Sequence, residues 1–295
     1  MGNIEKEALH YDEVKQVMFA LLCELDRVCQ LYDIHYCLAY GTLIGAVREH
    51  DMIPWDDDAD VFITTDNLQK LIAHKDAFRD GFRLVLPEDY GSNIYFDSVV
   101  RLNYTYSNTC EDSEESRYYS GLRSNLSLDL FHISPVPSGF RGWAYGVYMC
   151  VLYAMANAFR YRNATEHYTL GMKLANFILL PIGRRIGLPR LRRFIQQGQT
   201  KYDNKPCDKI HNNGDDVGAM FRFYAREDFD SIKRVNVSHG MFPIPVGYDR
   251  ILKQQYGDYM TPPAIDRRGW KFADVDYLQV CPPAEITPVK NNQQQ

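Results

Sequence analysis

The chain has 295 residues, 45% of them hydrophobic and 13% aromatic, which is enough for a sizeable core in one large domain or in a domain with an insertion. A formal net charge of -5 argues against nucleic-acid binding by bulk electrostatics, which needs a basic face. The charged N-terminal stretch MGNIEKEALHYDEVK has no apolar segment typical of a signal peptide, so we expect a cytoplasmic protein. The seven cysteines include no CxxC pair, and we expect them to be reduced and mostly buried.

The first element that the sequence predicts is an amphipathic helix between residues 11 and 34. Its apolar residues recur at every third or fourth position: Val14, Val17, Met18, Leu21, Leu22, Leu25, Val28 and Cys29. This spacing gives a helix one continuous apolar face. We therefore expect residues 1–34 to form a helix packed on the core.

A short strand, a short helix and a connector are predicted next. HYCLAYGT (35–42) is typical of a strand that runs into Gly41, and LIGAVR (43–48) of one or two helical turns. Pro54 is incompatible with the interior of a strand or helix, so the residues around it are predicted to connect two elements.

An acidic cluster follows, with five aspartates in ten positions: Asp51, Asp56, Asp57, Asp58 and Asp60. DDADVFI (57–63) predicts a strand in which Asp58 and Asp60 share one face and apolar residues take the other. Alternation places Asp56 on the same side, as an outer-shell acceptor, whereas Asp57 is expected to face solvent or cap a turn. Carboxylates this close repel unless a cation intervenes, and Mg²⁺ prefers such hard oxygen ligands.

Two other interpretations of the acidic cluster are a solvated loop and a structural calcium site. The cluster lies between apolar segments and not in low-complexity charge, which favours a catalytic metal site over both. An EF-hand is excluded because DDDADVFITTDN lacks the glycine at position 6 and the glutamate at position 12 of that loop.

Further elements of a sheet are predicted up to residue 133. Asp66 is a candidate N-cap for a helix that ends near Gly81. Candidate strands follow at 82–86, 94–100 and 126–133. Asp129 is the only acid in the last of these strands, and an acid among apolar residues is costly unless it is paired or binds a metal.

Several residues near the predicted acids are candidates for phosphate binding. Gly41 and Thr42, between a strand and a helix start, can offer backbone N–H groups to a phosphate. Arg48 and Arg101, the latter just after an apolar strand, are further candidates, although a salt bridge from Arg48 to a nearby aspartate is nearly as well supported. With the acids they compose a site for metal-dependent phosphoryl or nucleotidyl transfer. His50, His132 and His239 lack zinc-ligand spacing and receive no role.

Residues 141–205 are predicted to be a helical, basic insertion. Residues 143–159 carry no charge and suit a buried or surface-lying helix. In residues 170–193 apolar side chains accompany five arginines and no acid, which suits contact with an anionic bilayer or a phosphorylated acceptor; a solvated basic face is an equal alternative. Residues 206–285 are expected to complete the catalytic domain, with a helix at 248–256, and residues 286–295 to be a disordered tail.

Three blocks of the sequence carry a resemblance to a known family. YGTLIGAVREHDMIPWDDDADVFI (40–63) closely resembles the signature of the LicD family, which includes bacterial phosphocholine transferases and is related to fukutin and fukutin-related protein. SLDLFHISPVP (127–137) and HGMFPIPVGYDRILKQQYGDYMTPP (239–263) are similar to two later blocks of that family, in the same order. One departure is the pair His239-Gly240, where the family often has glutamate and glycine.

The resemblance implies a fold and a reaction that the residues alone left open. The fold would be an α/β (α+β) domain with a nucleotidyltransferase-like mixed sheet at residues 35–140, flanked by helices. Asp58, Asp60 and Asp129 would hold Mg²⁺, or Mn²⁺ in its place. The reaction would move phosphocholine or a polyol phosphate from a CDP-activated donor to a hydroxyl of a glycan or lipid-linked glycan, at the cytosolic face of the membrane, releasing CMP. Nucleotidyl transfer to a small molecule or protein, and non-catalytic glycan or nucleotide binding, are the alternatives.

Overall fold

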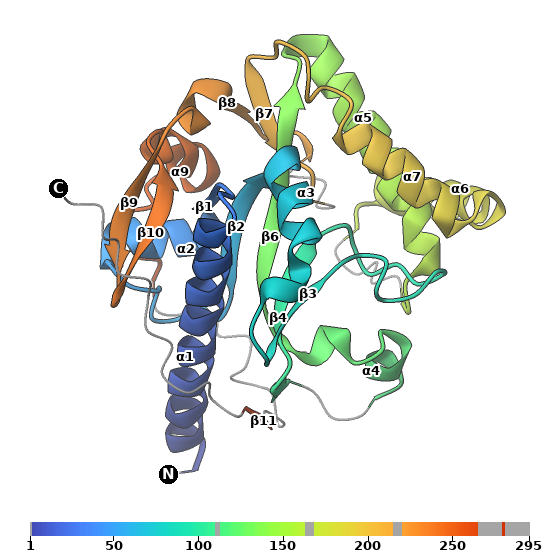
Figure 1. The fold of residues 1–295 in the computed structure, drawn as a ribbon. Helices are drawn as coiled ribbons and strands as arrows, with labels where there is room; N and C mark the ends of the chain where they lie inside the picture. Colours follow the sequence, from blue (N-terminus) through green and yellow to red (C-terminus); the bar gives the residue numbers. More distant parts are fainter. Residues whose placement is uncertain (1, 110–112, 163–167, 215–219, 265–278, 281–295) are drawn as a thin grey trace.

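The structure is a computed structural model that describes residues 2–109, 113–162, 168–214, 220–264 and 279–280 (Figure 1). Cys110, Cys281 and the predicted tail at 286–295 lie outside the described residues. Among the described cysteines, Cys23, Cys29 and Cys37 are buried thiols, as expected, whereas Cys150 and Cys207 are half-buried. Burial raises the pKa of the Cys23 thiol to about 12.

The predicted N-terminal helix is confirmed as α1 (Gly2–Leu31). All eight residues of the predicted apolar stripe are buried. Through this stripe α1 packs across strands β4 and β6 of the central sheet. Burial of aliphatic side chains of this size contributes roughly 1.5–3 kcal/mol each, so the stripe fixes α1 on the sheet.

A mixed sheet forms the centre of the molecule, in the order β1-β2-β6-β4-β3, and β7 and β8 extend it beyond β6. Its strands are β1 (Tyr36–Leu38), β2 (Ala59–Thr64), β3 (Phe82–Val85), β4 (Val100–Tyr104), β6 (Leu126–Val136), β7 (Lys209–Asn212) and β8 (Phe223–Ala225). β2 and β6 run parallel, and the other pairs are antiparallel. The expected α+β architecture, a mixed sheet flanked by helices, is confirmed.

Short elements connect and border these strands. They are α2 (Tyr40–Ile44) with a π-helical turn (Gly45–Glu49), α3 (Thr65–Ala73), the small strands β5 (Ser107–Asn108) and β11 (Gln279–Val280), α4 (Glu114–Tyr118), the hairpin β9 (Ile232–Val237) and β10 (Gly240–Pro245), α9 (Tyr248–Tyr256), and 3-10 turns at Lys75–Ala77, Leu122–Ser124, Asn157–Phe159 and Arg226–Phe229. The hairpin β9–β10 and α9 lie on one side of the sheet, and the α5–α7 helices lie on the other (Figure 1).

Two predicted elements differ from the structure. The strand predicted at 94–100 is irregular up to Val99, because the Asp97 carboxylate accepts the Val99 N–H at 2.9 Å in a local turn that competes with strand pairing. The predicted N-cap at Asp66 is also wrong: Thr64 is the N-cap residue of α3, Asp66 lies in the first turn, and the helix ends at Ala73. An acid in the first turn still suits the positive end of the helix dipole.

In the region of the helical insertion predicted at residues 141–205, the structure has α5 (Gly139–Ala156), α6 (Leu170–Ile186) and α7 (Leu188–Gln199). α5 packs against both other helices and has its own core with residues of β6 and β8. It buries one face and exposes residues such as Phe140 and Trp143 on the other. No helix in the described part of the chain is both long and apolar enough to cross a membrane.

Candidate active site

Asp60 and Asp129 stand side by side on neighbouring strands. In the parallel register of β2 and β6, Asp60 is paired with Asp129, and in the antiparallel register of β4 and β6, Arg101 is paired with Asp129. Paired positions on neighbouring strands point to the same face of a sheet. The sheet thus places the charges of Asp60, Asp129 and Arg101 in one row across three strands.

Arg101 joins two carboxylates at this row. Its Nε lies 3.0 Å from Asp129 Oδ1, and one terminal nitrogen lies 2.6 Å from Asp97 Oδ2. The sequence placed Arg101 after a strand, but it lies inside β4, with 11% of its side chain exposed. Burial raises the pKa of the Asp129 carboxyl, and the positive charge of Arg101 opposes that shift. Arg101 therefore has a structural partner in Asp97, which was not predicted from the sequence although it precedes Arg101 by only four residues.

A second acidic group lies where the chain enters β2. Carboxylate oxygens of Asp56, Asp57 and Asp58 all lie within 4.8 Å of one another. Asp57 was expected to face solvent or to cap a turn, and the first of these is wrong because only 4% of it is exposed. The predicted set of Asp58, Asp60 and Asp129 shares Asp58 with this group, and the negative charge of Asp58 adds to the rise in the pKa of Asp129. The charge of Asp58 thus acts on Asp129, but within the described residues the carboxylate oxygens of Asp58, Asp60 and Asp129 do not all lie within 4.8 Å of one another.

Gly41 and Thr42 contact the acids through the first turn of α2. The helix begins at Tyr40, so both residues lie inside it rather than in a turn before it. A Cβ atom on Gly41 would lie 2.1 Å from Asp56 Oδ2, which means that only glycine leaves room for this carboxylate. The Thr42 hydroxyl is buried and accepts a hydrogen bond from the Asp60 N–H at 2.8 Å. In this structure both residues position aspartates of the site.

Arg48 makes structural contacts. Its Nε donates to Glu49 at 2.7 Å, a terminal nitrogen donates to the Tyr259 carbonyl at 2.7 Å, and its guanidinium stacks over Trp55. Arg48 thus forms the salt bridge that was the alternative prediction, but its partner is Glu49 and not an aspartate. The contact with Tyr259 also ties this region to the C-terminal block of the chain.

Two tyrosines that the sequence analysis did not consider lie near the acids. The first is Tyr256 in α9. Desolvation of the Tyr256 hydroxyl, together with the negative charges of Asp60 and Asp56, raises its pKa, although 48% of the residue is exposed. Burial and, more weakly, the charge of Asp60 raise the pKa of Tyr40, whose hydroxyl accepts from the Asn212 amide at 2.6 Å. Tyr256 belongs to the third block of the family resemblance (239–263), and this is the sequence feature that could have marked it as a site residue.

His132, which received no role from the sequence, lies with His211, which the sequence did not single out, in a buried polar network. His132 Nε2 lies 2.7 Å from the Thr65 hydroxyl, and His211 Nε2 lies 3.2 Å from the Tyr145 hydroxyl. Burial lowers the pKa of His132 to about 3 and that of His211 to about 4. Both are therefore neutral hydrogen-bonding groups of the interior.

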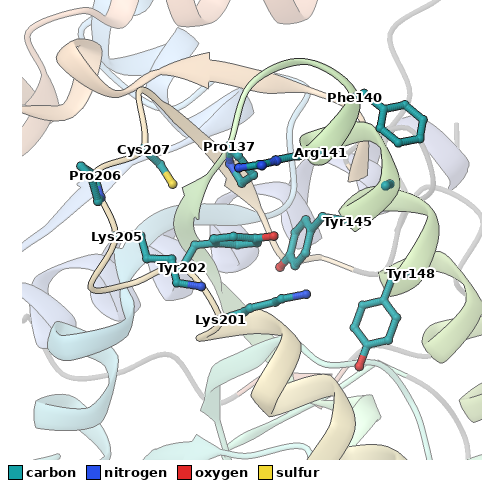
Figure 2. A pocket seen from close by; sticks show the side chains of 11 residues that line it. Pro137, Phe140, Arg141, Tyr145, Tyr148, Lys201, Tyr202, Lys205, Pro206 and Cys207 are labelled. Atoms are coloured by element: carbon teal, nitrogen blue, oxygen red, sulfur yellow. The ribbon is translucent and has the colours of Figure 1, made fainter.

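A separate cavity of about 710 Å³ lies between the start of α5 and residues 201–207 (Figure 2). Its polar lining comprises Arg141, Tyr145, Tyr148, Lys201, Tyr202 and Lys205. In Figure 2 the rings of Tyr145 and Tyr202 lie against each other, with a centroid separation of 5.5 Å. None of the predicted site residues lines this cavity.

Comparison with known proteins identifies relatives of the chain. The family model described as the LicD/FKTN/FKRP nucleotidyltransferase domain matches residues 33–113. The chain is 24% identical over 273 residues to the lipopolysaccharide cholinephosphotransferase LicD of Haemophilus influenzae, covering 87% of this chain and 94% of that protein. The matched residues include β1, α2, β2 and β4, and so contain Gly41, Asp58, Asp60 and Arg101. Both matches thereby confirm the resemblance to the LicD family that was seen in the sequence.

Proposed function

We propose that this protein is a metal-dependent transferase that moves a phospho-alcohol group, with phosphocholine the first candidate, from a CDP-activated donor to a hydroxyl of a glycan or lipid-linked glycan. The observation that carries the proposal is the pairing of Asp60 with Asp129 in adjacent parallel strands, with Asp58 two residues before Asp60. The similarity to a lipopolysaccharide cholinephosphotransferase over most of both chains supports phosphocholine as the transferred group.

The donor set suits a magnesium-class ion. All candidate ligand atoms are carboxylate oxygens, which Mg²⁺ prefers, and each carboxylate has two oxygens with about four acceptor positions in total. Asp129 can therefore accept from Arg101 and still offer an oxygen to a metal. Asp58, Asp60 and Asp129 would hold the ion, with Asp56 in an outer position, and Asp57 is a further candidate since its carboxylate reaches those of Asp56 and Asp58. Mn²⁺ suits the same ligands.

The bound metal would neutralise the negative charge on the transferred phosphate and orient the attacking oxygen in line with the leaving group. In the proposed reaction a bond forms between the acceptor oxygen and the phosphorus of the phospho-alcohol, and the bond from that phosphorus to CMP breaks. Arg101 holds Asp129 in place from the neighbouring strand, while Thr42 holds the backbone at Asp60. Gly41 leaves room for the Asp56 carboxylate.

The experiment that tests this proposal is an incubation of the full chain with Mg²⁺ and a panel of CDP-choline, CDP-ethanolamine, CDP-glycerol and CDP-ribitol, with a glycan acceptor such as lipopolysaccharide. CMP release from one donor, abolished by EDTA, is the expected result. The variants Asp58→Asn and Asp129→Asn should lose release while keeping the fold by circular dichroism. The matched control Asp76→Asn, at an exposed position, should keep it.

Product mass separates this proposal from its alternative. A gain of the phospho-alcohol mass on the acceptor, with free CMP, supports the proposed reaction. A gain of the CMP mass on the acceptor would instead identify a nucleotidyltransferase, the activity after which the matched domain is described. Full activity of Asp58→Asn would overturn the assignment of the metal site.

A further inference from the structure

Helix α6 is apolar on the side that faces solvent. Its exposed apolar residues recur at helical spacing, and their exposed fractions are 61% at Leu174, 78% at Phe177, 54% at Ile178 and 44% at Ile182. We name these four residues the α6 outer face. A helix normally turns such a face toward the core, and a contiguous exposed apolar patch marks an interaction surface.

The opposite side of α6 is fixed on α5, so the outer face cannot turn inward. Asn176 and Gly183 are buried in this contact, and Leu179 packs on the same core as α5. A Cβ atom on Gly183 would lie 2.1 Å from the Met155 carbonyl oxygen, so the two helices approach as closely as glycine allows. Figure 1 places α6 at the margin of the molecule, on the side away from α1 and the β9–β10 hairpin.

Basic residues surround the α6 outer face. Lys173, Arg184 and Arg185 of α6 and Arg190 and Arg193 of α7 are exposed. Residues 168–202 contain no aspartate or glutamate. Arg192 is excluded from this surface, because its guanidinium donates to backbone carbonyls of the loop at residues 87–94. Each remaining arginine can keep its charged end at an anionic surface while its stem covers apolar area.

We propose that the α6 outer face and its flanking cations bind the surface of an anionic lipid bilayer, with α6 lying in the interfacial plane. An apolar face bordered by Lys and Arg is the pattern of helices that bind this interface, where burial of apolar area and attraction to anionic headgroups add together. A second copy of the chain fits less well, since pairing of two identical faces places the cations of one copy against those of the other. The inference does not depend on the transfer reaction proposed above.

The test is flotation of the full chain with vesicles of phosphatidylcholine alone and of phosphatidylcholine with phosphatidylglycerol. We expect strong flotation only with the anionic vesicles, and weaker flotation in high salt. Phe177→Gln with Ile178→Gln should weaken partitioning roughly ten-fold or more, because two exposed apolar side chains are removed. Arg184→Gln with Arg185→Gln should weaken it by a similar factor of roughly ten.

Matched controls keep the test specific. Ile232→Gln with Val246→Gln removes two exposed apolar residues at the β9–β10 hairpin and the loop after it. Lys75→Gln with Lys233→Gln removes two exposed cations elsewhere. Both control pairs should float like the wild type. Absence of flotation of the wild type, or equal flotation of the α6 and control variants, would overturn the proposal. A wild-type dimer that becomes a monomer in the Phe177→Gln, Ile178→Gln variant would overturn it in favour of a second copy.

Discussion

Arg101 in β4 faces Asp129 in β6 across two antiparallel strands, with 3.0 Å between the guanidinium Nε and the carboxylate. The other side of the same guanidinium binds Asp97 at 2.6 Å. One buried cation therefore compensates two largely buried carboxylates, one of which is a proposed metal ligand.

Arg101→Gln is expected to lower the free energy of unfolding by about 3–5 kcal/mol, because it leaves Asp97 and Asp129 largely buried without their cation. Urea denaturation measures this. The control Arg83→Gln, exposed on the neighbouring strand β3, should change stability by less than about 0.5 kcal/mol. The double variant Arg101→Gln, Asp97→Asn should lose less unfolding free energy than the sum of the losses in the two single variants, since the residues share one interaction. Simple additivity would contradict the shared role.

Gly41→Ala tests the close approach between α2 and Asp56. The new Cβ would lie 2.1 Å from the Asp56 carboxylate oxygen and would displace it. If Asp56 supports the proposed metal site, Mg²⁺ should bind roughly ten-fold more weakly, as expected for loss of an outer ligand. Calorimetric titration with Mg²⁺ measures the change. Gly171→Ala, where a Cβ meets only ordinary contact, serves as the control and should bind as the wild type does.

Stability should fall as the pH is lowered below about 6.5, because His132 and His211 are buried as neutral groups. Their pKa values in the folded state are about 3 and about 4, below the ordinary value of 6.5. The unfolded chain therefore binds more protons in this range. The contribution is complete above about pH 6.5 and decreases as pH falls toward the folded-state values, by about 1 kcal/mol per pH unit for each histidine.

Urea denaturation at several pH values measures this slope. His132→Gln should remove roughly half of it, whereas His35→Gln, at an exposed position, should leave it unchanged. A wild-type stability that is flat between about pH 6.5 and pH 4 would show that these histidines do not titrate as described.

Gly183→Ala is expected to lower stability by about 1–3 kcal/mol, because the added methyl group meets the Met155 carbonyl and forces α6 away from α5. Alanine is otherwise the better helix former, so Gly171→Ala in the same helix should cause no loss. Thermal denaturation of the two variants compares them directly. Equal behaviour would mean that α6 is not held at this point.

The sequence predicted best where a periodic pattern and a buried face coincide. The stripe from Val14 to Cys29 required α1, and the alternation of polar and apolar residues around Asp60 and Asp129 required two strands. Failures came from side chains that bind the local backbone or distant partners. Asp97 forms a turn with Val99 where apolar residues favoured a strand, and nothing in the local pattern shows this hydrogen bond.

The site was predictable in its acids and less so in its supporting residues. Asp57 was expected to face solvent or to cap a turn, but it lies in the connector before β2, where strand alternation does not apply, and its side chain is buried. The neighbours of Asp129 depend on strand register, which local sequence does not specify, so the pairing with Arg101 emerged only from the fold. Tyr256 in α9 lies near enough to Asp60 and Asp56 for their charges to raise its pKa, and only tertiary packing brings together residues so far apart in the chain.

The position of the site strands along the chain determines when the site can assemble during synthesis. β2, β4 and β6, which carry Asp60, Arg101 and Asp129, all precede residue 137, so the row of charges can form before the helices α5, α6 and α7 have left the ribosome. Tyr256 and the carbonyl of Tyr259 that binds Arg48 are synthesised more than a hundred residues after β6. A nascent chain would therefore hold its paired acids early, whereas Tyr256 joins them only when α9 docks.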